Sequence, residues 1–203
     1  MQTNERIGLT FASILRSFLR QDPEVILIGE IRDYETVDIA IKAALTGHLL
    51  LSTLHTNDAA TTISRLLNMG VPDYMIVASL SLVIAQRLSR TSCRACLESD
   101  PKATPEALKK IGFSEADLEG LNAKHGRGCP VCNDTGYKGR RGIYEVLRVT
   151  AEVEEKILAG GDSGDIIAAA RSDGFRTMQE IGRELIAEGV LDIAEYQRVL
   201  VMS

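Results

Sequence analysis

Residues 19–33 read LRQDPEVILIGEIRD, and this stretch decides the fold. Pro23 pushes the residue before it out of the helical region, so the amphipathic helix predicted over residues 10–21 ends there. The apolar, β-branched run at residues 25–29 predicts a strand buried on both faces. Glu30 follows that strand, and ligands bind at the carboxyl ends of strands in open α/β folds. A carboxylate there can order a magnesium-bound or attacking water beside a γ-phosphate, although a solvated turn fits the same spacing.

The flanking sequence alternates helices with strands. Further helices are predicted over residues 34–46, from residue 57 or 58 to Asn68, and over residues 72–90, with a second buried strand over residues 49–54. Such alternation favours a parallel sheet with helices on its faces, so the predicted fold class is α/β.

Two histidines flank the second predicted strand, in the stretch TGHLLLSTLHTND at residues 46–58. Their spacing of seven would place His48 and His55 on opposite faces of an unbroken strand. Because His55 is expected in a polar loop beyond the strand end, we expect both to approach one ligand-binding edge. An imidazole there can contact phosphate or relay a proton. The alternative, a hydrogen-bonded structural histidine, applies to His48 more than to His55.

The four cysteines form two C-x-x-C pairs, Cys93/Cys96 and Cys129/Cys132. Two such pairs predict one tetrahedral zinc site, and four thiolates leave no position for water, so the metal would be structural. Free core thiols or a redox pair are the alternatives. We expect the segment between the pairs, residues 97–128, to be a helical insertion.

The charge distribution suggests three modules, because residues 1–90, 91–149 and 150–203 carry net charges of −1, +2 and −6. After a strand-like segment at residues 143–149, the tail is expected to form three or four short helices. The net charge of −5 and the 4% aromatic content disfavour nucleic acid as a partner. No apolar run approaches the ~20 residues of a membrane span, and no secretion signal is evident, so we expect a cytoplasmic protein.

The carboxylate-ended strand, the histidine stretch and the tetracysteine segment, in this order, resemble the secretion and pilus assembly ATPases. These are the motors of type II secretion and type IV pili. The segment GCPVCNDTGYKGRRGIYE at residues 128–145 looks most like the pilus extension motor. The resemblance covers nearly the whole chain and depends on three independent motifs.

This resemblance implies three domains: part of a RecA-like ATPase core (residues 1–90), a zinc-binding tetracysteine subdomain (91–149) and a C-terminal helical subdomain (150–203). It implies a homo-hexamer that acts on an inner-membrane platform protein from the cytoplasmic side, with ATP and Mg²⁺ as cofactors of the complete motor.

The resemblance also assigns roles to individual residues. Glu30 would be the Walker B glutamate, and His48 and His55 would face the nucleotide. The zinc ligands would be Cys93, Cys96, Cys129 and Cys132. One departure is Glu24, where the family usually has Asp, and we expect little consequence from it.

None of the 17 glycines is followed by lysine, so the sequence contains no G-x-x-x-x-G-K-[ST] phosphate-binding loop. In the family this loop lies upstream of the segment that matches residues 5–10. We therefore expect the chain to be the C-terminal part of a motor and to hydrolyse no ATP on its own. A zinc-stabilised assembly module without turnover and a RecA-like nucleic-acid translocase are the alternative functions.

Overall fold

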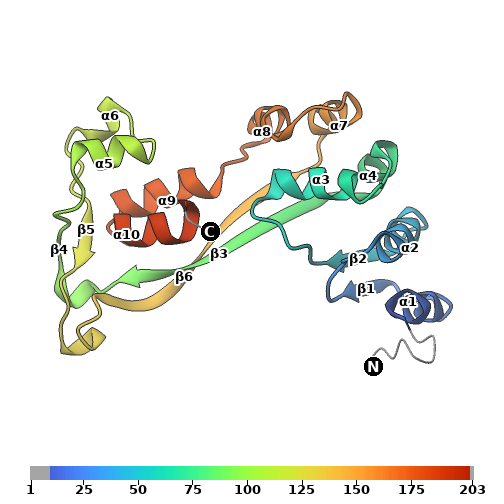
Figure 1. Cartoon of the computed structure of the whole chain (residues 1–203), viewed down its shortest axis with the longest axis horizontal. Helices are drawn as coiled ribbons and strands as arrows, with labels where there is room; N and C mark the ends of the chain where they lie inside the picture. Colours follow the sequence, from blue (N-terminus) through green and yellow to red (C-terminus); the bar gives the residue numbers. More distant parts are fainter. Residues whose placement is uncertain (1–9, 202–203) are drawn as a thin grey trace. The chain divides into compact units, whose positions relative to one another are not determined.

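The computed structural model describes residues 10–201, so most of the segment at residues 5–10 lies outside the described residues. As predicted, the fold is α/β (Figure 1). The helices are α1 (Phe11–Leu19), α2 (Tyr34–Leu45), α3 (Ala59–Asn68), α4 (Asp73–Ser79), α5 (Pro105–Lys110), α6 (Glu115–Leu118), α7 (Ala151–Leu158), α8 (Ser163–Ala170), α9 (Met178–Ala187) and α10 (Ile193–Tyr196). The strands are β1 (Val25–Ile28), β2 (Leu49–Ser52), β3 (Leu82–Ser92), β4 (Leu97–Ser99), β5 (Lys124–Gly126) and β6 (Tyr137–Arg148).

The chain divides into two compact units. Unit 1 comprises the chain up to Val83 together with Val146–Phe175, and unit 2 comprises Ile84–Glu145 together with the chain from Arg176 onward. Of the helices that follow β6, α7 and α8 belong to unit 1 and α9 and α10 to unit 2. The three domains, residues 1–90, 91–149 and 150–203, stay a prediction from the sequence.

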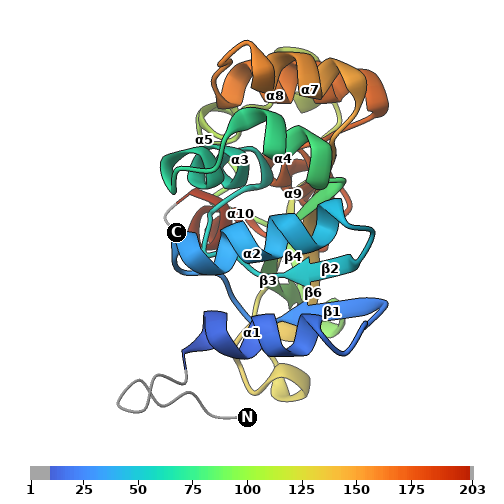
Figure 2. The same ribbon diagram turned by 90° about the vertical axis from the view of Figure 1, so that its right-hand side faces the viewer.

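The core of unit 1 is built around a parallel pair of strands. In register, Val25 lies opposite Leu49 and Leu27 opposite Leu51. Helices α1 and α2 lie on the same side of this pair, as two perpendicular views agree (Figures 1 and 2). Side-chain oxygens of Thr10, Asp33 and Asp58 cap the amino ends of α1, α2 and α3, which explains why these helices begin where they do.

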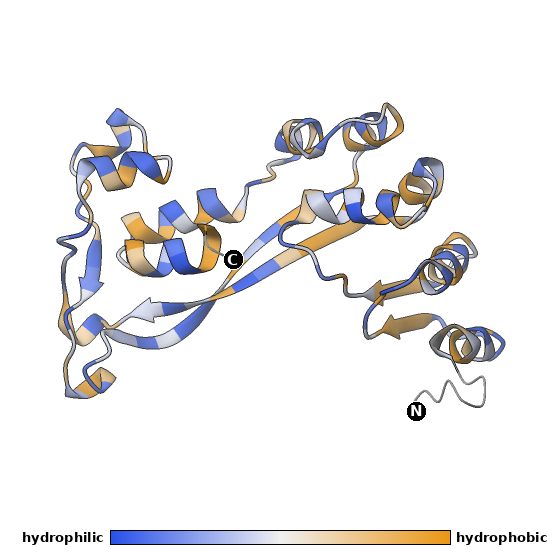
Figure 3. Ribbon diagram, viewed as in Figure 1, coloured by the Kyte–Doolittle hydropathy of each residue, from blue (hydrophilic) through white to orange (hydrophobic). Residues whose placement is uncertain are grey.

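The other face of the β1/β2 pair is apolar and exposed. Val25 is 56% exposed, Leu27 76%, Leu49 57% and Leu51 51%, and Figure 3 shows both strands as hydrophobic. These four side chains share one face, whereas Ile26 and Ile28 on the other face are buried. The prediction of strands buried on both faces is therefore wrong for the part of the chain that the structure describes. We call these four residues the open apolar face.

The prediction of one helix over residues 72–90 is wrong beyond Ser79. Helix α4 ends there, and β3 begins at Leu82. Burial along β3 alternates, with Val83, Ala85 and Ser89 buried between exposed neighbours, which is the period of a strand. The continuous apolar run before it fits a buried helix equally well by composition, so the change of period at Leu82 was missed.

Unit 2 contains most of the β3/β6 pair and a smaller antiparallel pair, β4/β5. Helices α5 and α6 connect β4 to β5, so the segment between the cysteine pairs contains helices, as expected. The strand predicted over residues 143–149 is longer than expected, because β6 begins at Tyr137. Within residues 10–201, no helix is long and apolar enough to span a membrane.

Candidate functional site

Glu30 and His55 meet at the carboxyl end of the β1/β2 pair. Glu30 follows β1 and His55 follows β2, and because the strands are parallel both residues lie at the same edge of the sheet. His55 Nε2 lies 2.9 Å from Glu30 Oε2, and Arg32 Nη2 lies 2.8 Å from the other carboxylate oxygen. The structure thus confirms the predicted position of Glu30 at a strand end and brings His55 to it.

Backbone contacts between the two loops fix this arrangement. The Thr53 hydroxyl donates to the Gly29 carbonyl oxygen at 2.6 Å, and the Ile31 N–H donates to the Thr53 carbonyl oxygen at 3.0 Å. The loops that carry Glu30 and His55 are therefore tied to each other directly beyond the strands.

The electrostatics of the site favour an ionised Glu30. The hydrogen bond from Arg32 lowers the pKa of Glu30 most, the hydrogen bond from His55 lowers it further, and the opposing effect of burial is smaller. The Glu30 side chain is 38% exposed and the His55 side chain 81%. A charged carboxylate with this access can accept a hydrogen bond from a water molecule beside a phosphoryl group.

His48 lies at the opposite end of β2. Its Nδ1 is 3.0 Å from the Ala43 carbonyl oxygen and 3.1 Å from the Thr46 hydroxyl. The four residues of β2 extend about 13 Å, so His48 does not reach the edge that carries Glu30. The expectation that both histidines approach one edge is therefore wrong within this chain, and His48 makes the hydrogen bonds of the structural alternative.

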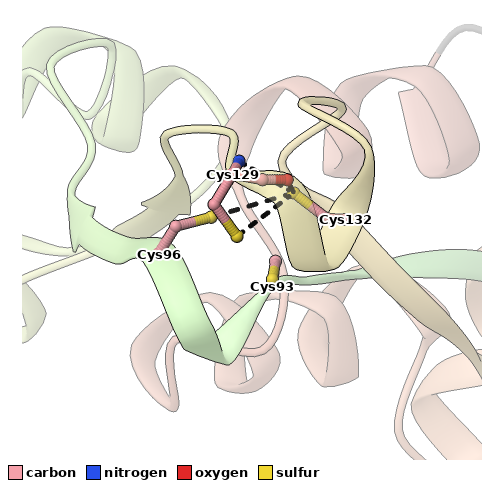
Figure 4. Close-up of side chains that lie close together, drawn as sticks. All are labelled: Cys93, Cys96, Cys129 and Cys132. Atoms are coloured by element: carbon pink, nitrogen blue, oxygen red, sulfur yellow. Dashed lines mark hydrogen bonds between the residues drawn. The ribbon is translucent and has the colours of Figure 1, made fainter.

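The four cysteines converge in unit 2, as Figure 4 shows. Cys93 and Cys96 flank the turn after β3, and Cys129 and Cys132 belong to the turn before β6. All four Sγ atoms lie within 4.8 Å of one another, with Cys96 and Cys132 at 4.0 Å and Cys129 and Cys132 at 3.8 Å. Thiolates around tetrahedral zinc are about 3.8 Å apart, so the cluster could hold such a metal ion.

Backbone N–H groups point at the sulfur atoms. Gly128 donates to Cys96 Sγ at 3.3 Å, and Cys129 donates to Cys132 Sγ at 3.2 Å. Burial raises the pKa of Cys96 to about 12. Burial also acts to raise the pKa of Cys132, but N–H groups of Cys129 and Gly136 outweigh it and lower that pKa to about 6.

The backbone around the cluster requires glycine at one close approach. A Cβ atom at Gly126 would lie 1.9 Å from the Gly136 carbonyl oxygen, so these two chain segments can approach only with glycine there. This approach joins the end of β5 to the residues just before β6, on either side of the second cysteine pair.

A buried ionic group in unit 2 was missed by the sequence analysis. The side chain of Glu195 is fully buried and accepts hydrogen bonds from the Arg90 backbone and guanidinium and from Arg198. Burial acts to raise the pKa of Glu195, but Arg198 and Arg90 outweigh it and lower the pKa to about 2. Asp192 caps α10, and nothing in the Asp192-x-x-Glu195 spacing indicates the two arginines.

Comparisons with known proteins show the family of this chain and agree with its fold. The family described as "Type II/IV secretion system protein" matches residues 1–198. The chain therefore belongs to that family of secretion-system proteins.

Two individual relatives show which members of this family the chain is similar to. The chain is 48% identical to the type IV pilus assembly ATPase PilB of Acinetobacter baylyi, over 98% of this chain and 34% of that protein. It is 42% identical to the type II secretion system ATPase E of Vibrio cholerae, over 98% of this chain and 39% of that protein. The chain thus spans little more than a third of the length of these relatives.

Solved structures show the same fold. The pilus retraction motor PilT with bound ADP superposes with a TM-score of 0.62 and 26% identity, over 93% of this chain and 43% of that one. The ATPase DotB of Legionella pneumophila, at 24% identity, superposes with a TM-score of 0.60 over 93% of this chain and 42% of that one.

Proposed function

We propose that this chain is the C-terminal portion of a cytoplasmic motor ATPase that drives type IV pilus assembly or type II protein secretion. The observation that carries the proposal is the Glu30–His55 pair, 2.9 Å apart at the carboxyl end of two parallel strands. The relatives that match almost the whole chain are described as ATPases of these two machines, which supports the same activity here.

In this proposal Glu30 is the catalytic residue. Mg²⁺-ATP, when bound in the complete motor, supplies the phosphoryl group that is transferred to water. Glu30 accepts a hydrogen bond from the attacking or metal-bound water and orients it, which its ionised state allows. His55 holds the Glu30 side chain through the contact between its Nε2 and the carboxylate. His48 fixes the turn before β2 through its contact with the Ala43 carbonyl oxygen.

The open apolar face supports the idea that further protein completes the ATPase core. Parallel sheets occur almost only with both faces covered, and four large apolar side chains on one face of a two-stranded sheet contradict that pattern. We propose that another part of a longer motor covers Val25, Leu27, Leu49 and Leu51 and brings the phosphate-binding loop to Glu30. The isolated chain is accordingly proposed to be inactive.

We further propose that Cys93, Cys96, Cys129 and Cys132 bind a structural Zn²⁺. The donor set supports this proposal, because four sulfur atoms at near-tetrahedral spacing saturate the metal, and two of them accept backbone N–H groups. The metal would then stabilise unit 2 and take no part in hydrolysis.

The assembly proposed for the complete motor is a homo-hexamer that works with an inner-membrane platform protein and lies peripherally at the cytoplasmic side of that membrane. Relatives named as secretion and pilus ATPases support this assembly. Nucleic acid is not part of the proposal.

The experiment that tests the catalytic assignment is steady-state ATP hydrolysis by a longer protein that carries this chain behind a phosphate-binding loop. We expect Glu30→Gln to lower kcat at least about 100-fold, the range of a lost catalytic base. Glu24→Gln is the matched control, because it makes the same change at the other end of β1, on an exposed side chain. Equal rates for the two variants would contradict the assignment, and turnover by the isolated chain would contradict its proposed inactivity.

A further inference from the structure

A hollow of about 570 Å³ lies in unit 2 beside the turn that follows β3. Lys138, Arg140 and Arg141 of β6 line it, together with Arg94 from the turn between Cys93 and Cys96. No carboxylate of the described residues is among its lining. We call this feature the Arg/Lys hollow.

The four cations of the Arg/Lys hollow differ from other arginines of unit 2. Arg90 and Arg198 bind Glu195, and Arg176 binds Glu184. The four lining cations are exposed and, within residues 10–201, none of them forms an ion pair. Like charges gathered in a concave surface produce a positive potential that attracts anions.

Ser92 provides a second and independent observation. It lines the Arg/Lys hollow and is only 4% exposed, yet its hydroxyl has no hydrogen-bond partner among the described residues. Buried hydroxyl groups are almost always hydrogen-bonded, so the wall of the hollow contains a buried polar group that the described residues leave unpaired. Neighbouring Thr91 is different, because its hydroxyl donates to the Lys138 carbonyl oxygen at 2.6 Å.

We propose that the Arg/Lys hollow binds a ligand through phosphate groups. Guanidinium and ammonium groups are donors only, and phosphate offers several acceptor oxygens for them. A tetrathiolate zinc centre beside the hollow would carry two negative charges, which leaves about two positive charges of the four to be balanced by a ligand. A phosphate dianion matches that charge, a diphosphate exceeds it slightly, and the volume is within the ~300–1,000 Å³ of small-molecule sites.

This site is separate in sequence from the proposed ATPase site. Its lining contains neither Glu30 nor His55, and all its residues belong to unit 2, whereas those two belong to unit 1. The proposal therefore goes beyond the motor function, and a failure of the ATP hydrolysis test would not affect it.

The test is calorimetric titration of the zinc-loaded chain with inorganic pyrophosphate at low ionic strength, with zinc content measured before and after. We expect Lys138→Gln/Arg140→Gln to weaken binding at least about tenfold. The matched control is Lys102→Gln/Lys110→Gln, which removes two exposed charges from the same unit outside the hollow. Both double variants change exposed side chains, so both should keep the wild-type circular dichroism spectrum.

Separate arms identify the source of the phosphate. Pyrophosphate binding that only the Lys138/Arg140 variant weakens supports a free phosphorylated ligand. Binding only to vesicles containing phosphatidylglycerol, with the same dependence on the variants, supports a lipid headgroup as the source. Citrate that binds as tightly as pyrophosphate would overturn the assignment to phosphate. Equal weakening in both double variants, or no binding of pyrophosphate or vesicles, would overturn the site.

Discussion

The β1/β2 pair of unit 1 exposes four large apolar side chains on one face, whereas unit 2 buries three carboxylates, Glu145, Asp192 and Glu195. Unit 2 satisfies those charges internally, since Glu145 accepts the Met178 N–H at 3.0 Å and Glu195 binds two arginines. Its four cysteines likewise face one another. Unit 2 therefore carries its own stabilising contacts, whereas the β1/β2 pair of unit 1 leaves one apolar face exposed within the described residues.

Among the changes proposed here, loss of the metal is expected to have the largest effect on the difference in stability between unit 2 and the β1/β2 pair. Structural zinc contributes apparent binding energies of about 10–16 kcal/mol, so Cys129→Ser should unfold residues 91–141 while the β1/β2 pair keeps its protection. Hydrogen exchange measured by mass spectrometry, with and without a chelator, resolves the two regions. Equal loss of protection in both would contradict the separate stabilisation of unit 2.

The buried Glu195 gives the next largest effect. Glu195→Gln removes the charge that Arg90 and Arg198 share, and breaking a buried pair costs roughly 3–5 kcal/mol. Urea unfolding followed by a probe in unit 2 checks this value. Glu188→Gln, an exposed change close by in sequence, should alter the free energy of unfolding by less than about 0.5 kcal/mol.

The contacts of Glu195 also predict how the free energy of unfolding changes in acid. Its pKa is about 2 in the folded chain and near its ordinary value of 4.5 in the unfolded chain. Its stabilising contribution is therefore fully present above pH 4.5 and is lost as the pH falls toward 2. In Glu195→Gln this part of the acid dependence of unfolding should be absent. An unchanged acid profile in the variant would contradict the lowered pKa.

Two neighbouring residues of β1 test the open apolar face directly. Ile28 is 1% exposed and Leu27 is 76% exposed, so Ile28→Ala should cost about 3 kcal/mol and Leu27→Ala less than about 0.5 kcal/mol in this chain. In a longer protein that covers the face, Leu27→Ala should also cost about 2 kcal/mol or more. Chemical denaturation of both variants in both proteins measures this, and an equal cost of Leu27→Ala in the two proteins would contradict the proposed cover.

The smallest effect concerns the pKa of Glu30 and leaves the stability unchanged. Because Arg32 lowers that pKa more than His55 does, Arg32→Gln should raise it further than His55→Asn. Carbon-detected NMR titration of the Glu30 carboxyl group measures both shifts. A larger shift in His55→Asn would contradict the prediction that Arg32 lowers the pKa of Glu30 more than His55 does.

Local chemistry explains which features could be predicted from the sequence. The pairing of the cysteines and the position of Glu30 after a strand depend on residues close together in the chain, and the structure confirms that the four cysteines cluster and that Glu30 follows β1. The strand β3 was missed because an apolar run hides the change from helical to alternating period at Leu82. The contacts of Glu195 were missed because Arg90 lies 105 residues away and no local spacing encodes the pair.

His48 shows a second kind of limit. The sequence predicts a histidine at each end of β2, and the structure confirms this, but the strand is long enough to keep His48 away from the edge where His55 contacts Glu30. The length of a short strand depends on its sheet partners, which the local sequence does not contain. The open apolar face was missed because the apolar composition of both strands predicts burial on both faces, whereas the described residues cover only one of them.

The most direct test of the central claim is a single-turnover measurement of ATP hydrolysis in a longer protein that carries this chain behind a phosphate-binding loop. Our account predicts that Glu30→Gln retains ATP binding but leaves the bound ATP unhydrolysed, while Glu24→Gln hydrolyses it at the wild-type rate. Hydrolysis of bound ATP by Glu30→Gln at the wild-type rate would contradict the role of Glu30 and, with it, the assignment of the Glu30–His55 edge as the catalytic site.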